Sequence, residues 1–579
     1  MYYPRLKKRA VTRSIIDRFY GYDCRPGAAE GSFCETENIS CRLFPLLSSR
    51  KPRGICEKTG ECQGLISKDA LIWVSGGRLY INGEASPLDE ISPGEKQLIS
   101  MGAYVCVFPD KLYLNTADPS DYGSMEAGWS FEGSMRCAMC DVDGNELEML
   151  SYGPSAPAEP GEGEYWVNSG DGSLMRYSEV NGLWLASESI YCRLSFASQG
   201  QITQLFSACD GVEISLPQLP ELEGSKIIYA LGGSSGENAE DDYIVLICEK
   251  ALETRTFQGS INVERPVPDM DFVCQCNNRL WGCRYGNDGS GNINELYACA
   301  LGDFKNWQQF MGLSTDSWRA SVGSDGPWTG AVGYLDTPIF FKEDRIHRVG
   351  ISPGGAHRVS ESVGRGVQKG SHKSLQIVDE TLYYKSPTDI CAYQGGFGQS
   401  VSEALGEHRY SEAAAGTLGQ NYYISMKDEE GKRQLFVYDT ARGLWIREGE
   451  LETADFAQWG GELYCVSAGR LVAINGSRGE REQNIHWRAR TGMIAAARPG
   501  QKYISRLSLR LAMEQEGQME IFAEYDSSGL WEFVGRIRME HSGSAELPLP
   551  LRRCDHLRLE MRGWGEMKLF SITREMSAY

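Results

Sequence analysis

The chain has 579 residues, enough to bury a large core, and its 66 glycines are spread without a period. The formal net charge of −20 argues against broad nucleic-acid binding, because phosphate contacts need clustered lysines and arginines. We find no signal-peptide pattern and no apolar run of about 18 residues, so no membrane span is expected. Abundant aromatic residues and scarce helical periodicity predict a mostly β protein. The 18 cysteines are scattered, which favours reduced, buried thiols.

Residues 1–55 are rich in Gly, Pro, Ser and charged residues, and their apolar residues come singly. We expect an extended N-terminal arm that becomes ordered by lying on its own fold or on a neighbour. Its basic start is either solvated or docks on an acidic neighbour or on nucleic acid. The expected interface residues are Arg5, Lys7, Lys8, Arg9, Arg13, Arg50, Lys51 and Arg53.

Short alternating strands separated by Gly, Asn and Asp turns begin after this arm. The stretch 271–307 shows the unit most clearly, as three strands, two turns and a closing Trp307. Repeats of about 40–50 residues with four strands each predict a β-propeller of about five to seven blades. We expect the propeller to occupy residues 56–189 and 261–487.

Two segments depart from this rhythm. Residues 190–260 alternate more cleanly and lack a closing Trp, which favours a small β-barrel inserted into the propeller; another blade is the alternative. Residues 488–579 contain longer strands with strict period-two alternation, which predicts a C-terminal antiparallel β-sandwich. The predicted fold class is therefore all-β, with a propeller, an inserted barrel and a sandwich.

Motifs with a chemical meaning are weak in this chain. None of the seven histidines has metal-ligand spacing, and a single CxxC at Cys137–Cys140 is poor evidence for zinc. Ser324–Trp328 is similar to the Asp-box of sialidase propellers but shorter and unrepeated, so a turn is expected. A carboxylate pair for glycoside hydrolysis is set by spatial distance, and nothing in the sequence singles one out. We expect no catalytic residue, metal or cofactor.

A resemblance to a known family lies in several longer stretches. FYGYDCRPG, EGSF and FPLLSSRKPRG in the arm resemble the opening of tailed-bacteriophage virion proteins. NNRLWGCRYG, NELYACALGDFKNW, GSDGPWTG and FFKEDRIHRV are similar to the blades of the same proteins. The family comprises β-propeller virion proteins of the tail nozzle and packaged-DNA stabilisation type. The segment 190–249 is similar to the small barrel that some members carry.

The resemblance implies a structural role without catalysis. Members form a ring of six copies around the tail axis, contact portal, adaptor or tail-fibre proteins, and close or extend the channel through which packaged DNA leaves. It also implies a virion location in the phage tail, after assembly in the host cytoplasm. Two alternatives stay open: a host-glycan-binding or glycosidase-like propeller at the tail tip, and an intracellular propeller scaffold. The first predicts an aromatic-rich pocket with two nearby carboxylates.

Overall fold

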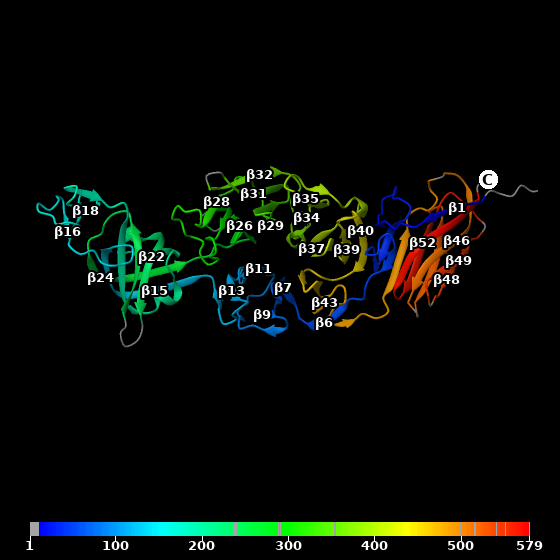
Figure 1. Cartoon of the computed structure of the whole chain (residues 1–579), viewed down its shortest axis with the longest axis horizontal. Coiled ribbons are helices and arrows are strands. Elements are labelled where there is room, and N and C mark those ends of the chain that lie inside the picture. The colour runs from blue at the N-terminus through cyan, green and yellow to red at the C-terminus, as the bar shows by residue number, and fades with distance from the viewer. Residues whose placement is uncertain are drawn as a thin grey trace, which may run out of the picture.

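The computed structural model of this chain describes residues 11–234, 240–287, 289, 291–352, 355–497, 499–514, 517–539, 541–550 and 552–577. These residues form an elongated body with three β-rich parts in a row (Figure 1). A barrel lies at one end, a propeller in the middle and a sandwich at the other end. The predicted fold class is confirmed.

The propeller has seven blades within the described residues, at the upper end of the predicted range. Six blades are four-stranded antiparallel sheets whose strands follow one another in the chain. Their strands are β7 (Cys62–Ser67), β8 (Leu71–Ser75), β9 (Arg78–Ile81), β10 (Glu84–Ala85); β11 (Gln97–Met101), β12 (Tyr104–Phe108), β13 (Leu112–Asn115), β14 (Tyr122–Ser124); β25 (Phe272–Cys276), β26 (Arg279–Asn287), β27 (Asn292–Ala298), β28 (Trp318–Ser321); β29 (Gly330–Tyr334), β30 (Thr337–Lys342), β31 (Arg345–Ile351), β32 (His357–Val363); β33 (Gln376–Val378), β34 (Thr381–Lys385), β35 (Ile390–Tyr393), β36 (Gln399–Ser400); and β37 (Ser411–Leu418), β38 (Asn421–Lys427), β39 (Arg433–Asp439), β40 (Leu444–Glu450).

The turns inside the blades lie at the Asn and Gly residues that predict them in the sequence. Asn277 and Asn278 join β25 to β26, and both adopt the left-handed backbone conformation that a two-residue hairpin turn requires. Gly76 and Gly77 do the same between β8 and β9. In the blade that contains β25–β28, Trp281 and Trp307 are buried, so this stretch is a blade closed by packed tryptophans.

The seventh blade closes the ring with strands from both ends of the propeller sequence. β6 (Gly54–Lys58) lies between β43 (Arg470–Ala473) and β44 (Glu480–Arg481), beside β42 (Glu462–Ser467) and β41 (Phe456–Trp459). β41 also contacts β7 of the first blade. A Cβ added at Gly54 would lie 1.7 Å from the carbonyl oxygen of Arg478, so only glycine fits there.

A separate unit is inserted between the second and third blades. Its closed barrel has the order β15 (Ala127–Cys140), β20 (Ile190–Gln199), β23 (Glu240–Cys248), β22 (Gly224–Ser234), β21 (Gly211–Ser215), β24 (Arg255–Arg265). The short helices α1 (Ile202–Leu205) and η1 (Pro220–Leu222) belong to it. A four-stranded sheet lies beyond the barrel: β16 (Leu150–Gly153), β17 (Tyr165–Asn168), β18 (Leu174–Ser178), β19 (Leu183–Ala186).

The inserted unit is larger than the predicted segment 190–260. β15 pairs with β24 over eleven residues from Ala127 to Cys137, which brings the chain before residue 190 into the barrel. Val167 and Leu174 of the small sheet pack in the barrel's hydrophobic core. The hairpins between residues 135 and 189, expected in the propeller, therefore belong to the insertion. Their hairpin pattern is the same in either place, which is why the sequence did not separate them.

The sandwich combines both ends of the chain. One sheet contains β1 (Val11–Ile16), β4 (Ile39–Ser40), β5 (Leu47–Ser49), β46 (Lys502–Met513), β49 (Gly543–Pro548), β50 (Arg553–Cys554) and β52 (Met567–Ser577). The other contains β2 (Gly21–Tyr22), β3 (Ser32–Glu37), β45 (His486–Thr491), β47 (Gln518–Tyr525), β48 (Trp531–Ile537) and β51 (Leu557–Trp564). Two further short helices, η2 (His372–Ser374) and η3 (Glu403–Leu405), lie in the propeller.

The prediction of an extended arm over residues 1–55 is wrong for its described part. Phe19, Phe33, Ile39 and Leu47 fill the sandwich core together with the C-terminal strands. The strands that contain Phe33, Ile39 and Leu47 are two to six residues long, too short to produce a visible alternation in the sequence. Residues 1–10 lie outside the described residues.

Candidate functional site

The channel at the centre of the propeller holds a cavity of about 240 Å³. The innermost strands of all seven blades line it, because each blade begins with the strand nearest the axis. The walls combine apolar and polar side chains, and Phe272 and Phe456 are the phenylalanines among them. The charged side chains come from short segments just before β11, β33 and β41.

An ion cluster lies at this cavity. The Lys373 ammonium is 2.9 Å from Oε1 of Glu95 and 2.8 Å from Oδ1 of Asp455. His372 Nε2 lies 3.5 Å from the same Glu95 oxygen, and the His372 ring packs at 5.1 Å from the ring of Phe272. One lysine therefore joins three different blades across the axis of the propeller.

Burial and charge act against each other on these groups. Burial favours the neutral form of Glu95, but the Lys373 ammonium outweighs it and holds the pKa of Glu95 below its usual range. The pKa of Asp455 is raised by its deeper burial, which Lys373 only partly offsets. Burial also lowers the pKa of His372 to about 4, so this imidazole is neutral at pH 7.

The cluster has one arrangement that glycosidases use and one that they do not. It contains two carboxylates whose pKa values are pushed apart, as an acid and base pair requires. However, the Lys373 ammonium contacts both carboxylates and occupies the space in which a glycosidic oxygen or an attacking water would have to lie. In this arrangement the cluster blocks the channel and joins three blades through ion pairs.

The predicted interface residues Arg50 and Arg53 lie inside the molecule, between the sandwich and the propeller. Arg50 donates to Glu482 at 2.6 Å and to Asn38 at 2.6 Å, and its pKa is lowered by burial and by the nearby Arg53. Arg53 is 3.3 Å from Glu448 of β40. The prediction that these two arginines face another molecule is wrong, because their guanidinium groups bind carboxylates of the same chain.

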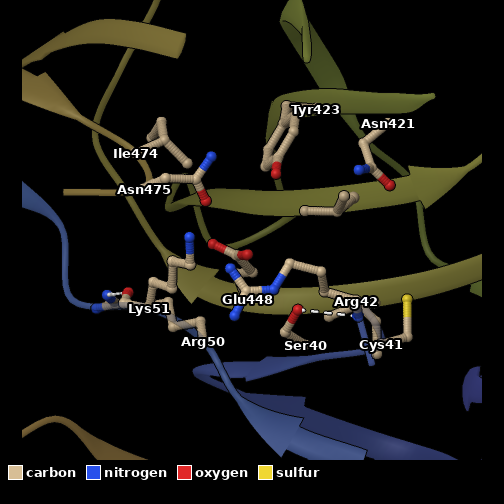
Figure 2. Close-up of a pocket in the computed structure, with 12 residues that line it drawn as sticks. Ser40, Cys41, Arg42, Arg50, Lys51, Asn421, Tyr423, Glu448, Ile474 and Asn475 are labelled. Carbon is tan, nitrogen blue, oxygen red and sulfur yellow. Dashed lines mark hydrogen bonds between the residues drawn. The ribbon is translucent and has the colours of Figure 1, made fainter. Parts of the chain in front are cut away.

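A small cavity of about 40 Å³ lies beside this junction, and Figure 2 shows its lining residues. Lys51 and Glu448 contribute to the wall together with Tyr423, Asn421 and Asn475 of the propeller. It is about the size of a water site and too small for an organic ligand. Lys51 itself is exposed at its rim.

The remaining predicted interface residues are basic residues near the start of the chain. Arg13 lies on β1, where its side chain is 74 % exposed and 2.6 Å from Glu575. Its role at an interface stays a prediction. Arg5, Lys7, Lys8 and Arg9 lie outside the described residues.

The weak chemical motifs are structural where they are described. Cys137 and Cys140 are buried thiols. A hydrogen bond with Cys192, 3.2 Å away, holds the pKa of Cys137 below its usual range, and burial raises the pKa of Cys140 to about 12. Ser324–Trp328 joins two blades, with Trp328 buried. Among the described residues no group of His, Cys, Asp and Glu side chains could hold a metal ion, and no helix is long and apolar enough to cross a membrane.

The sequence interpretation missed the channel cluster. Glu95, His372, Lys373 and Asp455 each precede an innermost strand by a few residues, and this shared position is the one signal that points to them. This signal cannot be used from the sequence alone, because it requires the first strand of each blade to be known. The side chains come from positions up to 360 residues apart, which only the closed ring brings together.

Comparisons with known proteins give no family. No family model matches the sequence, and no curated protein matches it. Among solved structures, the exo-β-1,3-galactanase of Phanerochaete chrysosporium covers 52 % of this chain and 94 % of its own, at 8 % identity and a TM-score of 0.22. A GH43 glycoside hydrolase engineered for endo-xylanase and exo-arabinofuranosidase activity covers 54 % and 97 %, at 12 % identity and a TM-score of 0.19.

A puromycin-hydrolyzing peptidase of Mycobacterium tuberculosis covers 69 % of this chain and 56 % of its own, at 10 % identity and a TM-score of 0.23. These similarities are too low to carry an argument about activity. The propeller assignment rests on the seven sheets and their closed ring, which the chain's own strand pairing defines.

Proposed function

We propose that this chain is a structural component of a bacteriophage virion, a tail nozzle or hub protein whose copies form a ring around the DNA exit channel. The proposal carries forward the resemblance of its arm and blades to phage propeller proteins. The structural observation that supports it best is the way the parts are joined. Strands from both ends of the chain share the sandwich and the seventh blade, which makes a rigid building block.

Polar contacts join the parts at both ends of the propeller. Arg53, in the link between the sandwich and β6, contacts Glu448 of the sixth blade. At the other end of the propeller, Arg265 of the barrel donates to the carbonyl oxygen of Met125, just after the second blade, at 3.4 Å. Asn306 of the third blade donates to the carbonyl oxygen of Cys209 in the inserted unit at 2.8 Å. Removing one partner of a buried ion pair costs about 3–5 kcal/mol, so the Arg53–Glu448 contact resists movement of the sandwich relative to the propeller.

The channel cluster argues against one path for DNA in such a ring, the channel of a single propeller. The propeller's own channel contains only about 240 Å³ and is crossed by Lys373, so no duplex fits through one subunit. In the proposed ring the DNA path lies between subunits, and the net charge of −20 keeps phosphates from binding its wall.

Electron microscopy of the purified full chain, with mass photometry over a range of concentrations, tests this proposal. We expect closed rings of about six copies with an open lumen. A chain that stays a single copy at every concentration would contradict the proposed ring.

A second candidate function is glycoside hydrolysis, which the Glu95 and Asp455 carboxylates in the channel favour. It requires that Lys373 moves aside when a glycan binds. The test is hydrolysis of a panel of plant, fungal and bacterial polysaccharides by the wild type, with the Glu95→Gln and Asp455→Asn variants as controls. Hydrolysis that both variants abolish supports this candidate, and no hydrolysis by the wild type removes it.

A further inference from the structure

The small sheet at the tip of the inserted unit has an unpaired apolar edge. β19 pairs with β18, and no other described strand pairs with it. Leu183 and Leu185 on this edge strand are 62 % and 47 % exposed, and Val180 in the preceding turn is 93 % exposed. An exposed edge strand with apolar side chains offers its free backbone groups to a strand from another chain.

The same tip is strongly acidic. Between residues 140 and 189 the sequence has ten Asp and Glu residues, one Arg and no Lys. Three of the acidic residues flank the open edge: Glu179 lies in the turn before β19, Glu188 follows β19, and Glu162 accepts a hydrogen bond from the backbone N–H of Glu179. All three side chains belong to exposed residues. A strand that joins this edge should therefore be basic.

The start of the chain has the complementary character. Residues 1–10 read MYYPRLKKRA, with four cations, no acidic residue and two tyrosines. They precede β1, which is itself an edge strand of the sandwich, with Val11 59 % and Ile15 57 % exposed. Ten extended residues reach about 33 Å from β1, more than the four residues of β19 require. Pro4 lacks an N–H, which an outermost strand tolerates.

The two surfaces lie at opposite ends of the body, because the small sheet is at the barrel end and β1 is at the sandwich end (Figure 1). One copy therefore cannot join its own start to its own tip without spanning the whole propeller. We propose that residues 1–10 of one copy add as a basic strand to the acidic β19 edge of a second copy.

Each copy then offers one donor strand and one acceptor edge, which is a head-to-tail contact that closes into a ring when the rotation between copies allows it. The inference rests on the proposed ring and names the contact that forms it. Backbone pairing to β19 supplies affinity, while the exposed Glu162, Glu179 and Glu188 select a basic strand.

Mass photometry of the full chain tests the contact with two surface variants. The triple variant K7E/K8E/R9E alters the donor strand, and L183E/L185E alters the acceptor edge. Each should weaken self-association at least tenfold, and raising salt should weaken wild-type association because the contact is charged. The matched controls are K58E/K369E/R470E and L301E/L313E, which change exposed residues of the propeller by the same charge and should associate like the wild type.

Two mixing experiments give results that a folding defect would not give. K7E/K8E/R9E mixed with L183E/L185E leaves one intact donor and one intact acceptor, so one-to-one pairs and no larger assemblies should form. Combining K7E/K8E/R9E with E162K/E179K/E188K in one chain reverses both charges and should restore assembly. Wild-type rings that both surface variants leave unchanged would overturn this contact while the proposed function stands. A wild type that never assembles would contradict both.

Discussion

At the scale of single residues, the most consequential group is Lys373. Within the described part of the chain it is the one cation in contact with both Glu95 and Asp455, and Asp455 is the more buried of the two carboxylates. A buried carboxylate without a partner is far more costly than a buried pair, so the loss of the lysine matters more than the pair itself contributes.

Replacing Lys373 with Met should lower the free energy of unfolding of the propeller by about 3–5 kcal/mol, because Asp455 is left buried and unpaired. Adding Asp455→Asn to the same chain should restore much of this loss. Chemical denaturation monitored by tryptophan fluorescence measures both. The exposed Lys369→Met is the matched control. Equal stability of the Lys373→Met variant and the control would show that the cluster does not hold the blades together.

The pH dependence of stability should carry the signature of His372. Burial lowers its folded-state pKa to about 4, below the usual value of about 6.5, so the unfolded chain binds more protons between these two values. Stability should therefore fall as the pH is lowered from about 6.5 to 4, by up to about 3 kcal/mol from this residue. The lowered pKa of Glu95 acts in the same direction at the acidic end.

The His372→Gln variant should lose this part of the slope, whereas the exposed His541→Gln should keep it. Urea unfolding at intervals between pH 4 and 7 gives the comparison. Identical slopes for wild type and His372→Gln would mean that the imidazole is not held neutral by burial.

At the scale of elements, β6 decides whether the propeller closes. It is the strand from the start of the propeller sequence that pairs with both β43 and β44 at its end. Ile55 lies in both of these pairings. A proline at this position removes a ladder hydrogen bond from a strand that has neighbours on both sides.

The Ile55→Pro variant should destabilise the seventh blade by about 3 kcal/mol or more, and Ile55→Ala, which keeps the N–H, should cost less. Hydrogen exchange locates the effect. We expect faster exchange in β41–β43 and in β7 of the first blade, with the inserted barrel unchanged. Uniform exchange across the seven blades would contradict the role assigned to β6.

The sequence predicted elements far better than their partners. Alternation and turn residues such as Asn277 and Gly76 identified blade hairpins, because turn chemistry is local. The parts that it did not predict depend on distant pairing. β15 joins the barrel through β24, which lies more than a hundred residues later, and Phe33 enters a core built by residues after 486. Two-residue strands such as β2 and β4 leave no periodicity to read.

The candidate sites divide in the same way. The basic residues between Arg5 and Arg9 can be identified from composition alone, and Arg13 is exposed beside Glu575. The buried ion pairs of Arg50 and Arg53 could not be predicted, because the partner residues Glu482 and Glu448 lie about 400 residues away in the sequence. The channel cluster could not be predicted for the same physical reason, because the first strand of every blade contributes to the channel of a propeller.

At the scale of the whole molecule, the chain is an acidic, elongated body with β1, which follows the basic residues 1–10 in the sequence, at one end and an acidic tip at the other. Overall acidity should keep subunits apart, so assembly needs a local contact of opposite charge and a hydrophobic strand edge. The proposed head-to-tail contact has both properties. It also explains why the exposed leucines of β19 are tolerated in a body with net charge −20.

Electron microscopy of the assembled full chain tests the account most directly. It predicts closed rings in which every barrel-end tip contacts the sandwich end of its neighbour, around a lumen formed between subunits and wide enough for duplex DNA. Single copies at all concentrations, or rings in which the tip of the inserted unit faces solvent, would contradict it.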